Sequence, residues 1–220
     1  AIVLNSWTSG LIASVGSLDI EPGDEVITTP FSMCASAISI LHWNAIPVFA
    51  DINAETFCID PESVKSKITK KTKAIVVADI FGLSHDISAI NRIAKKNNLK
   101  VIADAAQAPF SFYNKKLAGT QSDIGGFSYN YHKHVHTGEG GAVVTNNKVL
   151  AERIRKIRNH AEASVKINDK LNNMLGYNFR MGELEASIGI IQLTKLKKKV
   201  KIRQFQANYL NKKLSKLIGV

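Results

Sequence analysis

The sequence predicts an α/β domain with a mixed, mostly parallel sheet flanked by helices. Short runs rich in β-formers alternate with amphipathic helical patterns, and this alternation is typical of parallel strands joined by crossover helices. The last two runs lie too close together for a crossover and flank a Gly-rich turn, which indicates an antiparallel or irregular insertion. A chain of 220 residues is long enough to bury the core of one large domain.

The elements follow one another in a regular order. The opening AIVLNS reads as a strand, and NSWTSGL then offers a helix start. Further strands are expected at 24–30, 46–52, 73–80, 100–106, 125–130 and 141–146. Between the first four of these, helices are expected around 33–43, 61–68 and 86–97.

The net charge of +11 arises entirely after residue 150. The segment KLKKKVKIRQ, residues 195–204, could attract nucleic acid. Apolar residues in and around it approximate a helical stripe, which favours a solvated amphipathic helix and no nucleic-acid partner. The stripe consists of Ile188, Ile191, Leu193, Leu196, Val200 and Phe205.

No apolar run approaches the roughly 20 residues that span a membrane, and the first residues lack a signal-peptide pattern. We therefore expect a cytoplasmic protein with no membrane partner. The chain starts in a strand and stops in or just past a helix, so we also expect it to be a piece of a longer protein.

Parallel sheets bind ligands beyond the carboxyl ends of their strands. After the first strand, Ser6 or Thr8 is a good helix cap, and a helix start can bind a phosphate or simply be capped without a ligand. In VIADAAQAPF, Asp104 ends an apolar run and Gln107 follows three residues later. A carboxylate there either caps the next turn or pairs with a cationic group such as a protonated ring nitrogen.

The stretch FSYNYHKHVHTGEGG, residues 127–141, places Lys133 among three histidines. In a regular strand the histidines would share one side, but a zinc site needs further ligands, so we expect no metal. Lys133 would then face the other side, either as an exposed loop lysine or as a desolvated amine that reacts with an aldehyde. In LGYNFRMGELEASIGIIQL, Asn178 and Arg180 precede a helix, and Arg180 suits an anion or serves only in helix capping.

Six stretches in order resemble the DegT/DnrJ/EryC1/StrS family of sugar aminotransferases, and within it a perosamine-synthase-like branch. They are LDIEPGDEVITTPFSMCASA, IPVFADINAETFCIDP, VIADAAQA, DIGGFSYNYHKHVHTGEGGAVVTN, IRNHA and GYNFRMGELEASIGIIQL. The resemblance implies the large domain of the pyridoxal 5′-phosphate (PLP)-dependent transferases of fold type I over residues 1–205. Residues 206–220 would end the helix that leads to a small C-terminal domain, and a segment before residue 1 would be missing.

The resemblance also implies roles for individual residues. Lys133 would be the Schiff-base lysine and the acid/base, Asp104 would pair with the pyridinium nitrogen, and Gln107 would lie near the ring's 3-oxygen. The cofactor phosphate would be held by Thr8, Ser9 and Ser128, and by Asn178 of a neighbouring subunit in a homodimer with shared sites. Met33 falls where many relatives stack an aromatic residue on the ring, and Trp7 where a small residue is commoner. Substrate contacts are expected from His134, His136 and Arg180.

The expected reaction is amino transfer from an amino acid, L-glutamate, to a nucleotide-linked 4-keto-6-deoxysugar, for amino-sugar and surface-polysaccharide biosynthesis. One rival is a sugar dehydratase of the same fold, in which a histidine replaces the Schiff-base lysine by the family's pattern. The other rival is a catalytically idle basic binding module.

Overall fold

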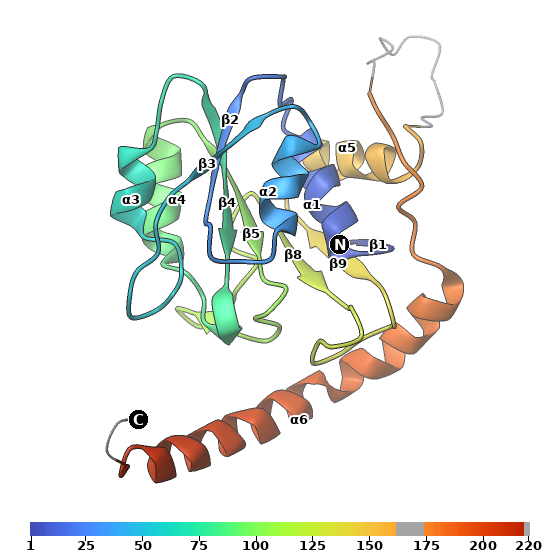
Figure 1. The fold of residues 1–220 in the computed structure, drawn as a ribbon. Coiled ribbons are helices and arrows are strands. Elements are labelled where there is room, and N and C mark those ends of the chain that lie inside the picture. The colour runs from blue at the N-terminus through green and yellow to red at the C-terminus, as the bar shows by residue number, and fades with distance from the viewer. Residues whose placement is uncertain (162–173, 218–220) are drawn as a thin grey trace.

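The computed structural model describes residues 1–161 and 174–217, which contain a seven-stranded sheet in the order β1-β9-β8-β5-β4-β2-β3 (Figure 1). The pairs β3-β2, β2-β4, β4-β5 and β5-β8 are parallel, whereas β9 is antiparallel to both β8 and β1. The predicted mixed, mostly parallel sheet is confirmed. Its strands are β1 Ile2–Leu4, β2 Glu25–Thr28, β3 Ile46–Phe49, β4 Thr72–Ala78, β5 Lys100–Asp104, β8 Ile124–Ser128 and β9 Gly141–Val144.

The helices of the described residues follow the predicted alternation. They are α1 Trp7–Gly16, α2 Ala35–Leu41, α3 Pro61–Ser66, α4 Ile87–Lys96, α5 Lys148–Arg158 and α6 Glu183–Leu214, with a 3-10 turn, η1, at Ile80–Gly82. Helix α5 and a small hairpin of β6 Phe112–Tyr113 and β7 Lys116–Leu117 were not predicted. Four helices begin at a side-chain cap that accepts hydrogen bonds from first-turn amides, namely Ser6, Asp60, Asp86 and Asn147.

Helices cover both faces of the sheet (Figure 1): α1 and α5 lie on one side, and α3 and α4 on the other. Alternate residues of β4 belong to the two resulting cores. Val76 packs with the α1 and α5 side, and Ile75 and Val77 with the α3 and α4 side. Because both faces are covered, the run AIVVA has no polar position, as is expected of a central parallel strand.

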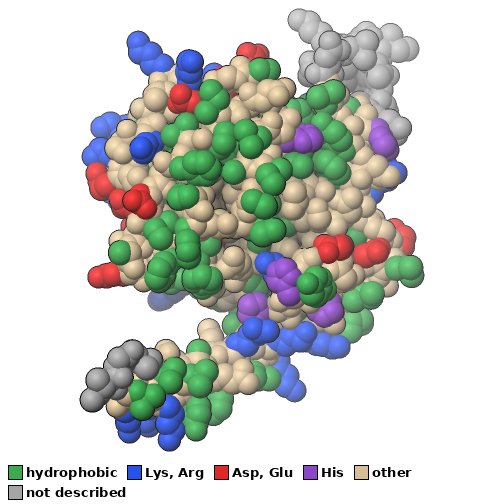
Figure 2. All heavy atoms as spheres, in the orientation of Figure 1, with side chains coloured by type: hydrophobic (Ala, Val, Ile, Leu, Met, Phe, Trp, Pro, Cys, Tyr) green, Lys and Arg blue, Asp and Glu red, His purple; other side chains and the backbone are tan. Residues whose placement is uncertain are grey.

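Helix α6 has 32 residues, none of them buried, and extends past the domain (Figure 1). The predicted basic helix is confirmed, and Figure 2 shows Lys and Arg side chains along it. The predicted single apolar stripe is wrong, because apolar side chains are spread around the helix and remain exposed, as at Phe205. The domain boundary expected at residue 205 falls inside α6 and stays a prediction.

Among the described residues, no helix combines the length and the apolar character needed to cross a membrane.

Candidate active site

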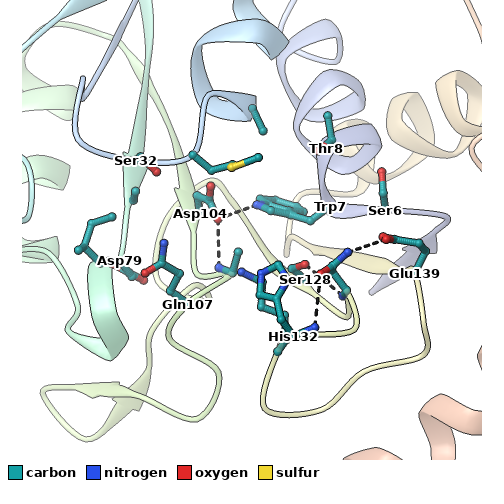
Figure 3. Close-up of a pocket in the computed structure, with 17 residues that line it drawn as sticks. Ser6, Trp7, Thr8, Ser32, Asp79, Asp104, Gln107, Ser128, His132 and Glu139 are labelled. Carbon is teal, nitrogen blue, oxygen red and sulfur yellow. Dashed lines mark hydrogen bonds between the residues drawn. The ribbon is translucent and has the colours of Figure 1, made fainter.

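A cavity of about 250 Å³ lies at the carboxyl edge of the sheet. Segments that follow β1, β2, β4, β5 and β8 all contribute side chains to it (Figure 3). This is the edge where a parallel sheet collects the ends of its strands, and the sequence predicted a ligand there. The cavity brings together six of the predicted residues, Thr8, Met33, Asp104, Gln107, Ser128 and Lys133.

The start of α1 forms one wall of the cavity. Ser6 caps the helix by accepting a hydrogen bond from the Ser9 amide at 3.0 Å, and Thr8 lines the wall. Ser128, at the end of β8, lines the same cavity. Ser9 lies outside the lining, because its hydroxyl is buried and donates to Asn5 Oδ1 at 2.7 Å. Ser6, and not Ser9, therefore lines the cavity beside Thr8. The predicted contact of Ser9 with a phosphate stays a prediction.

Asp104 is buried at the end of β5. Its Oδ1 accepts hydrogen bonds from the Ala106 amide at 3.0 Å and from the Trp7 indole at 2.6 Å (Figure 3). The carboxylate thus caps the following turn and also lines the cavity, so the two interpretations of the sequence are compatible. Burial raises the pKa of Asp104 to about 6, although both hydrogen bonds lower it.

The Asp104 carboxyl also feels two neighbouring charges. Asp79 raises its pKa further, whereas Lys133 lowers it. Lys133 is half-buried, and this burial lowers the pKa of its amine, while the Asp104 charge opposes that change. A partly desolvated amine with a lowered pKa is a better nucleophile near neutral pH than an exposed lysine.

The segment that carries Lys133 is a turn-rich loop and not a regular strand, so the condition for strand alternation is not met. Strand β8 ends at Ser128, and both His132 and Lys133 line the cavity instead of facing opposite sides. Asn130 donates to Glu139 Oε1 at 2.5 Å and ties the two ends of the loop together. No group of three potential metal-ligating side chains occurs among the residues that the structure describes.

The other two histidines lie outside this cavity. His134 lines a second hollow with Arg203 of α6, and its pKa is lowered by burial and then by Arg203, Lys133 and Lys199. His136 is half-buried and lines neither hollow. The predicted substrate contacts of His134 and His136 stay predictions.

Two further predicted residues line the rim of the cavity. Gln107 Oε1 accepts a hydrogen bond from the Phe81 amide at 3.0 Å, which leaves its Nε2 group to donate to a ligand oxygen. Met33 lines the cavity and is 68% exposed, so its thioether side chain can cover a flat ligand by apolar contact.

Asn178 and Arg180 do not reach the cavity of their own chain. Their segment runs beside β1, where the Asn5 amide donates to the Phe179 carbonyl at 2.9 Å. Arg180 forms a bridge with Leu4 and donates to Asn159 Oδ1. The proposal that Asn178 serves the site of a second subunit stays a prediction.

Sequence reasoning missed two residues that shape the site, Trp7 as a donor to Asp104 and Asp79 at the end of β4. Asp79 is buried, lines the cavity and accepts from His85 Nδ1 at 2.6 Å. The rule that ligands collect at strand ends could have indicated Asp79, because it ends the run KAIVVAD. Nothing in the sequence pattern relates Trp7 to Asp104, which lies 97 residues away.

The fold and the site define a class. A mixed α/β sheet with a lysine amine, a buried carboxylate and a capped helix start around one cavity is typical of the PLP-dependent transferases of fold type I. The chain belongs to the DegT/DnrJ/EryC1/StrS aminotransferase family, whose profile matches residues 1–220. The cofactor of this family is PLP.

Individual relatives agree with this assignment. The chain is 34% identical to a GDP-perosamine synthase of Vibrio cholerae, over 93% of this chain and 55% of that protein. NtdA from Bacillus subtilis, solved with bound cofactor PMP, superposes with a TM-score of 0.88 at 33% identity, over 98% of this chain and 49% of that one. The GDP-4-keto-6-deoxy-D-mannose-3-dehydratase of E. coli, solved with hydrated PLP, gives a TM-score of 0.87 at 26% identity, over 97% of this chain and 60% of that one. The chain spans about half the length of the curated relatives that it matches, from 46% to 60%.

Proposed function

We propose that the protein is a PLP-dependent aminotransferase that moves an amino group from an amino acid, L-glutamate, to a nucleotide-linked 4-keto-6-deoxysugar. The observation that carries the proposal is the meeting of Lys133 and Asp104 in one cavity beside the start of α1. An amine, a buried carboxylate and a helix N-terminus match, in turn, the aldehyde, the ring nitrogen and the phosphate of PLP.

The residues of the cavity fit this cofactor. Lys133 would bind the aldehyde carbon, and Asp104 would face the ring nitrogen through Oδ2, because Oδ1 already accepts two hydrogen bonds. Thr8 and Ser128 would donate to the phosphate together with the first amides of α1. When bound, PLP supplies an electron sink that stabilises the negative charge left on a substrate carbon after it loses a proton.

Lys133 has a second task in this proposal. Once a substrate amine has displaced it from the cofactor, Lys133 Nζ would be free to take up and return the proton of the substrate carbon. Its lowered pKa suits that task, because a neutral amine is needed to accept a proton near pH 7. Asp104 would remain ionised beside the ring nitrogen, and Gln107 Nε2 would donate to a ring oxygen.

The nucleotide-sugar acceptor is proposed from the relatives, since GDP-perosamine synthases match nearly the whole chain at about 34% identity. A dehydratase of the same fold is the alternative, because such enzymes are also structural neighbours. The dehydratase pattern expected from the family places a histidine at the position of Lys133, so the lysine favours amino transfer. A basic binding module without catalysis would leave the cavity residues without a role.

We also propose a homodimer in which Asn178 of one subunit completes the site of the other. Asn178 lies outside its own cavity but close to β1 and the start of α1, through the contact of Asn5 with its carbonyl at 3.4 Å. Light scattering of the protein would show twice the monomer mass, and a strict monomer in active preparations would contradict the proposal.

The decisive experiment is reduction with borohydride in the presence of PLP, followed by peptide mapping. We expect a pyridoxyl group on Lys133 in the wild type and none in Lys133→Ala, which should also lose transamination. His132→Asn is the matched control, because His132 lines the same cavity and is adjacent in sequence. This variant should keep the covalent link to PLP.

Product analysis separates the alternatives. With L-glutamate and a panel of nucleotide-linked keto-sugars, an aminotransferase forms 2-oxoglutarate and an amino sugar in equal amounts. A dehydratase forms a deoxysugar without an amino group, and a binding module gives no visible absorbance band with PLP. A pyridoxyl group on any other lysine of an active preparation would contradict the proposed site.

A further inference from the structure

The indole of Trp7 occupies a space that two glycines leave open. A Cβ atom at Gly126 of β8 would lie 1.8 Å from Trp7 Cζ3, and a Cβ atom at Gly10 of α1 would lie 2.7 Å from Trp7 Cε3. Trp7 is only 5% exposed, so the ring is enclosed and its orientation is determined by packing. A ring held in this way can direct its N–H group at a fixed point.

That point is the carboxylate of Asp104. Trp7 Nε1 donates to Asp104 Oδ1 at 2.6 Å, and the Ala106 amide donates to the same oxygen at 3.0 Å (Figure 3). Within the part of the chain that the structure describes, both hydrogen bonds to this carboxylate therefore involve Oδ1. Oδ2 is the oxygen left for a ligand in the cavity.

We propose that Trp7 is a positioning residue for Asp104: its indole N–H fixes Oδ1, presents Oδ2 to the cavity and keeps the carboxylate ionised. The hydrogen bond exists in the chain itself, and only its consequence for catalysis rests on the proposed function. Trp7 would act through Asp104 and would not react itself.

Asp104 needs such support because its surroundings oppose its charge. It is enclosed, and Asp79, a second buried carboxylate, faces the same cavity from the end of β4. These two influences raise its pKa, whereas the donors Trp7 and Ala106 and the charge of Lys133 lower it. The titratable groups that share the cavity with Asp104 are Asp79, Lys133, His132 and Glu139, and His85 lies behind Asp79.

The test uses the cofactor-free protein and needs no activity. The chain has two tryptophans, so its two indole N–H resonances in a proton–nitrogen NMR spectrum can be assigned by Trp7→Phe and Trp43→Phe. Trp43 is a matched control, because its Nε1 donates to the Ile12 carbonyl at 2.8 Å and its ring fills the space beside Gly16. Both indoles are therefore packed against a glycine and hydrogen-bonded, but of the two indole N–H groups only that of Trp7 donates to a titratable side chain. The Trp43 ring has the His42 ring as a neighbour, with 5.5 Å between the ring centroids.

We expect the Trp7 resonance to shift with pH at the same midpoint as the Asp104 carboxyl carbon and to lose that shift in Asp104→Asn. Any shift of the Trp43 resonance, whose ring neighbours His42, should persist in Asp104→Asn. In Trp7→Phe the midpoint of Asp104 should rise by about one pH unit, because a hydrogen bond to a charged group is lost. Trp43→Phe should leave that midpoint unchanged. The Asp104 carbon signal is identified by its loss in Asp104→Asn.

Two results would overturn the proposal: a Trp7 resonance that stays constant while Asp104 titrates, or a Trp7→Phe variant with an unchanged Asp104 midpoint. If Trp7→Phe does not fold, the wild-type titration alone still decides. The outcome is independent of the proposed function, because failure to trap PLP on Lys133 would contradict the reaction and leave the coupling of Trp7 and Asp104 intact.

Discussion

Replacing Asp104 by Asn should stabilise the cofactor-free protein at neutral pH. The substitution removes a buried negative charge but keeps an oxygen that can accept from Trp7 and Ala106. The substitution therefore removes only the free energy that the folded state loses by enclosing an ionised carboxylate. A residue expected to serve the cofactor would thus weaken the fold that carries it.

The magnitude follows from the pKa of Asp104, which is about 6 in the folded chain against 3.8 in the unfolded chain. Because the folded state binds the Asp104 proton more tightly, the free energy of unfolding is highest below pH 3.8. It falls as the pH rises through the folded-state pKa of about 6. A difference of roughly two pKa units means that Asp104→Asn should exceed wild type in free energy of unfolding by about 3 kcal/mol above pH 7. At pH 5 about half of this gain in the free energy of unfolding should remain.

Urea unfolding of wild type and Asp104→Asn at several pH values from 4.5 to 8 measures the difference directly. Every other titrating group is common to the two proteins. The difference between their free energies of unfolding at each pH is therefore the contribution of Asp104. Asp51→Asn is the control, because Asp51 is exposed and its removal changes the net charge equally. The control should differ from wild type by less than about 0.5 kcal/mol at every pH.

The reasoning is refuted if Asp104→Asn is no more stable than wild type at pH 8, or if the difference does not shrink as the pH falls. Either result would mean that the ionised carboxylate is not destabilised by its enclosure.

Two further predictions concern the walls of the cavity. Gly126→Ala should destabilise the protein by about 3 kcal/mol or prevent folding, because its Cβ would overlap the Trp7 ring and lie 2.7 Å from the Ala142 carbonyl oxygen. Trp7→Ala in the same chain relieves only the overlap with the ring, so thermal unfolding should show a cost of Gly126→Ala that is smaller than in wild type but not zero. His85→Ala should cost about 3 kcal/mol in urea unfolding, because it leaves Asp79 buried without its ring partner, and Asp79→Asn in the same chain should reduce that loss; additive losses would contradict the pairing.

The strands could be predicted because their sequence signals are local. Each run of β-formers between turn residues contains a strand, and the short connection after β8 announces the antiparallel β9. The hairpin of β6 and β7 has no apolar alternation, because each strand is only two residues long and largely exposed. Helix α6 was predicted from an approximate apolar stripe, but the exposure of its apolar side chains depends on contacts that a helical pattern does not determine.

The predicted site residues fall into two groups for a physical reason. Residues at the carboxyl end of a strand, such as Asp104 and Ser128, are positioned by the sheet, so the strand-end rule places them at the cavity. His134 and His136 lie on a loop whose course depends on long-range contacts, and alternation has no meaning there. The partnership of Trp7 with Asp104 depends on where two distant segments meet, which no local pattern records.

The pairing of β1 with β9 has a consequence for the order in which the site is built. Ile2 pairs with Val143, so β1 needs a strand about 140 residues later in the chain before it has a partner in the sheet. Strands β4 and β5, only about 25 residues apart in sequence, can pair much earlier and carry Asp79 and Asp104. From sequence separation alone, we expect both carboxylates to be fixed in the sheet before the segment that bears Trp7 packs against them. The enclosure of Asp104 and the packing of its indole donor are then expected to be one late event in folding.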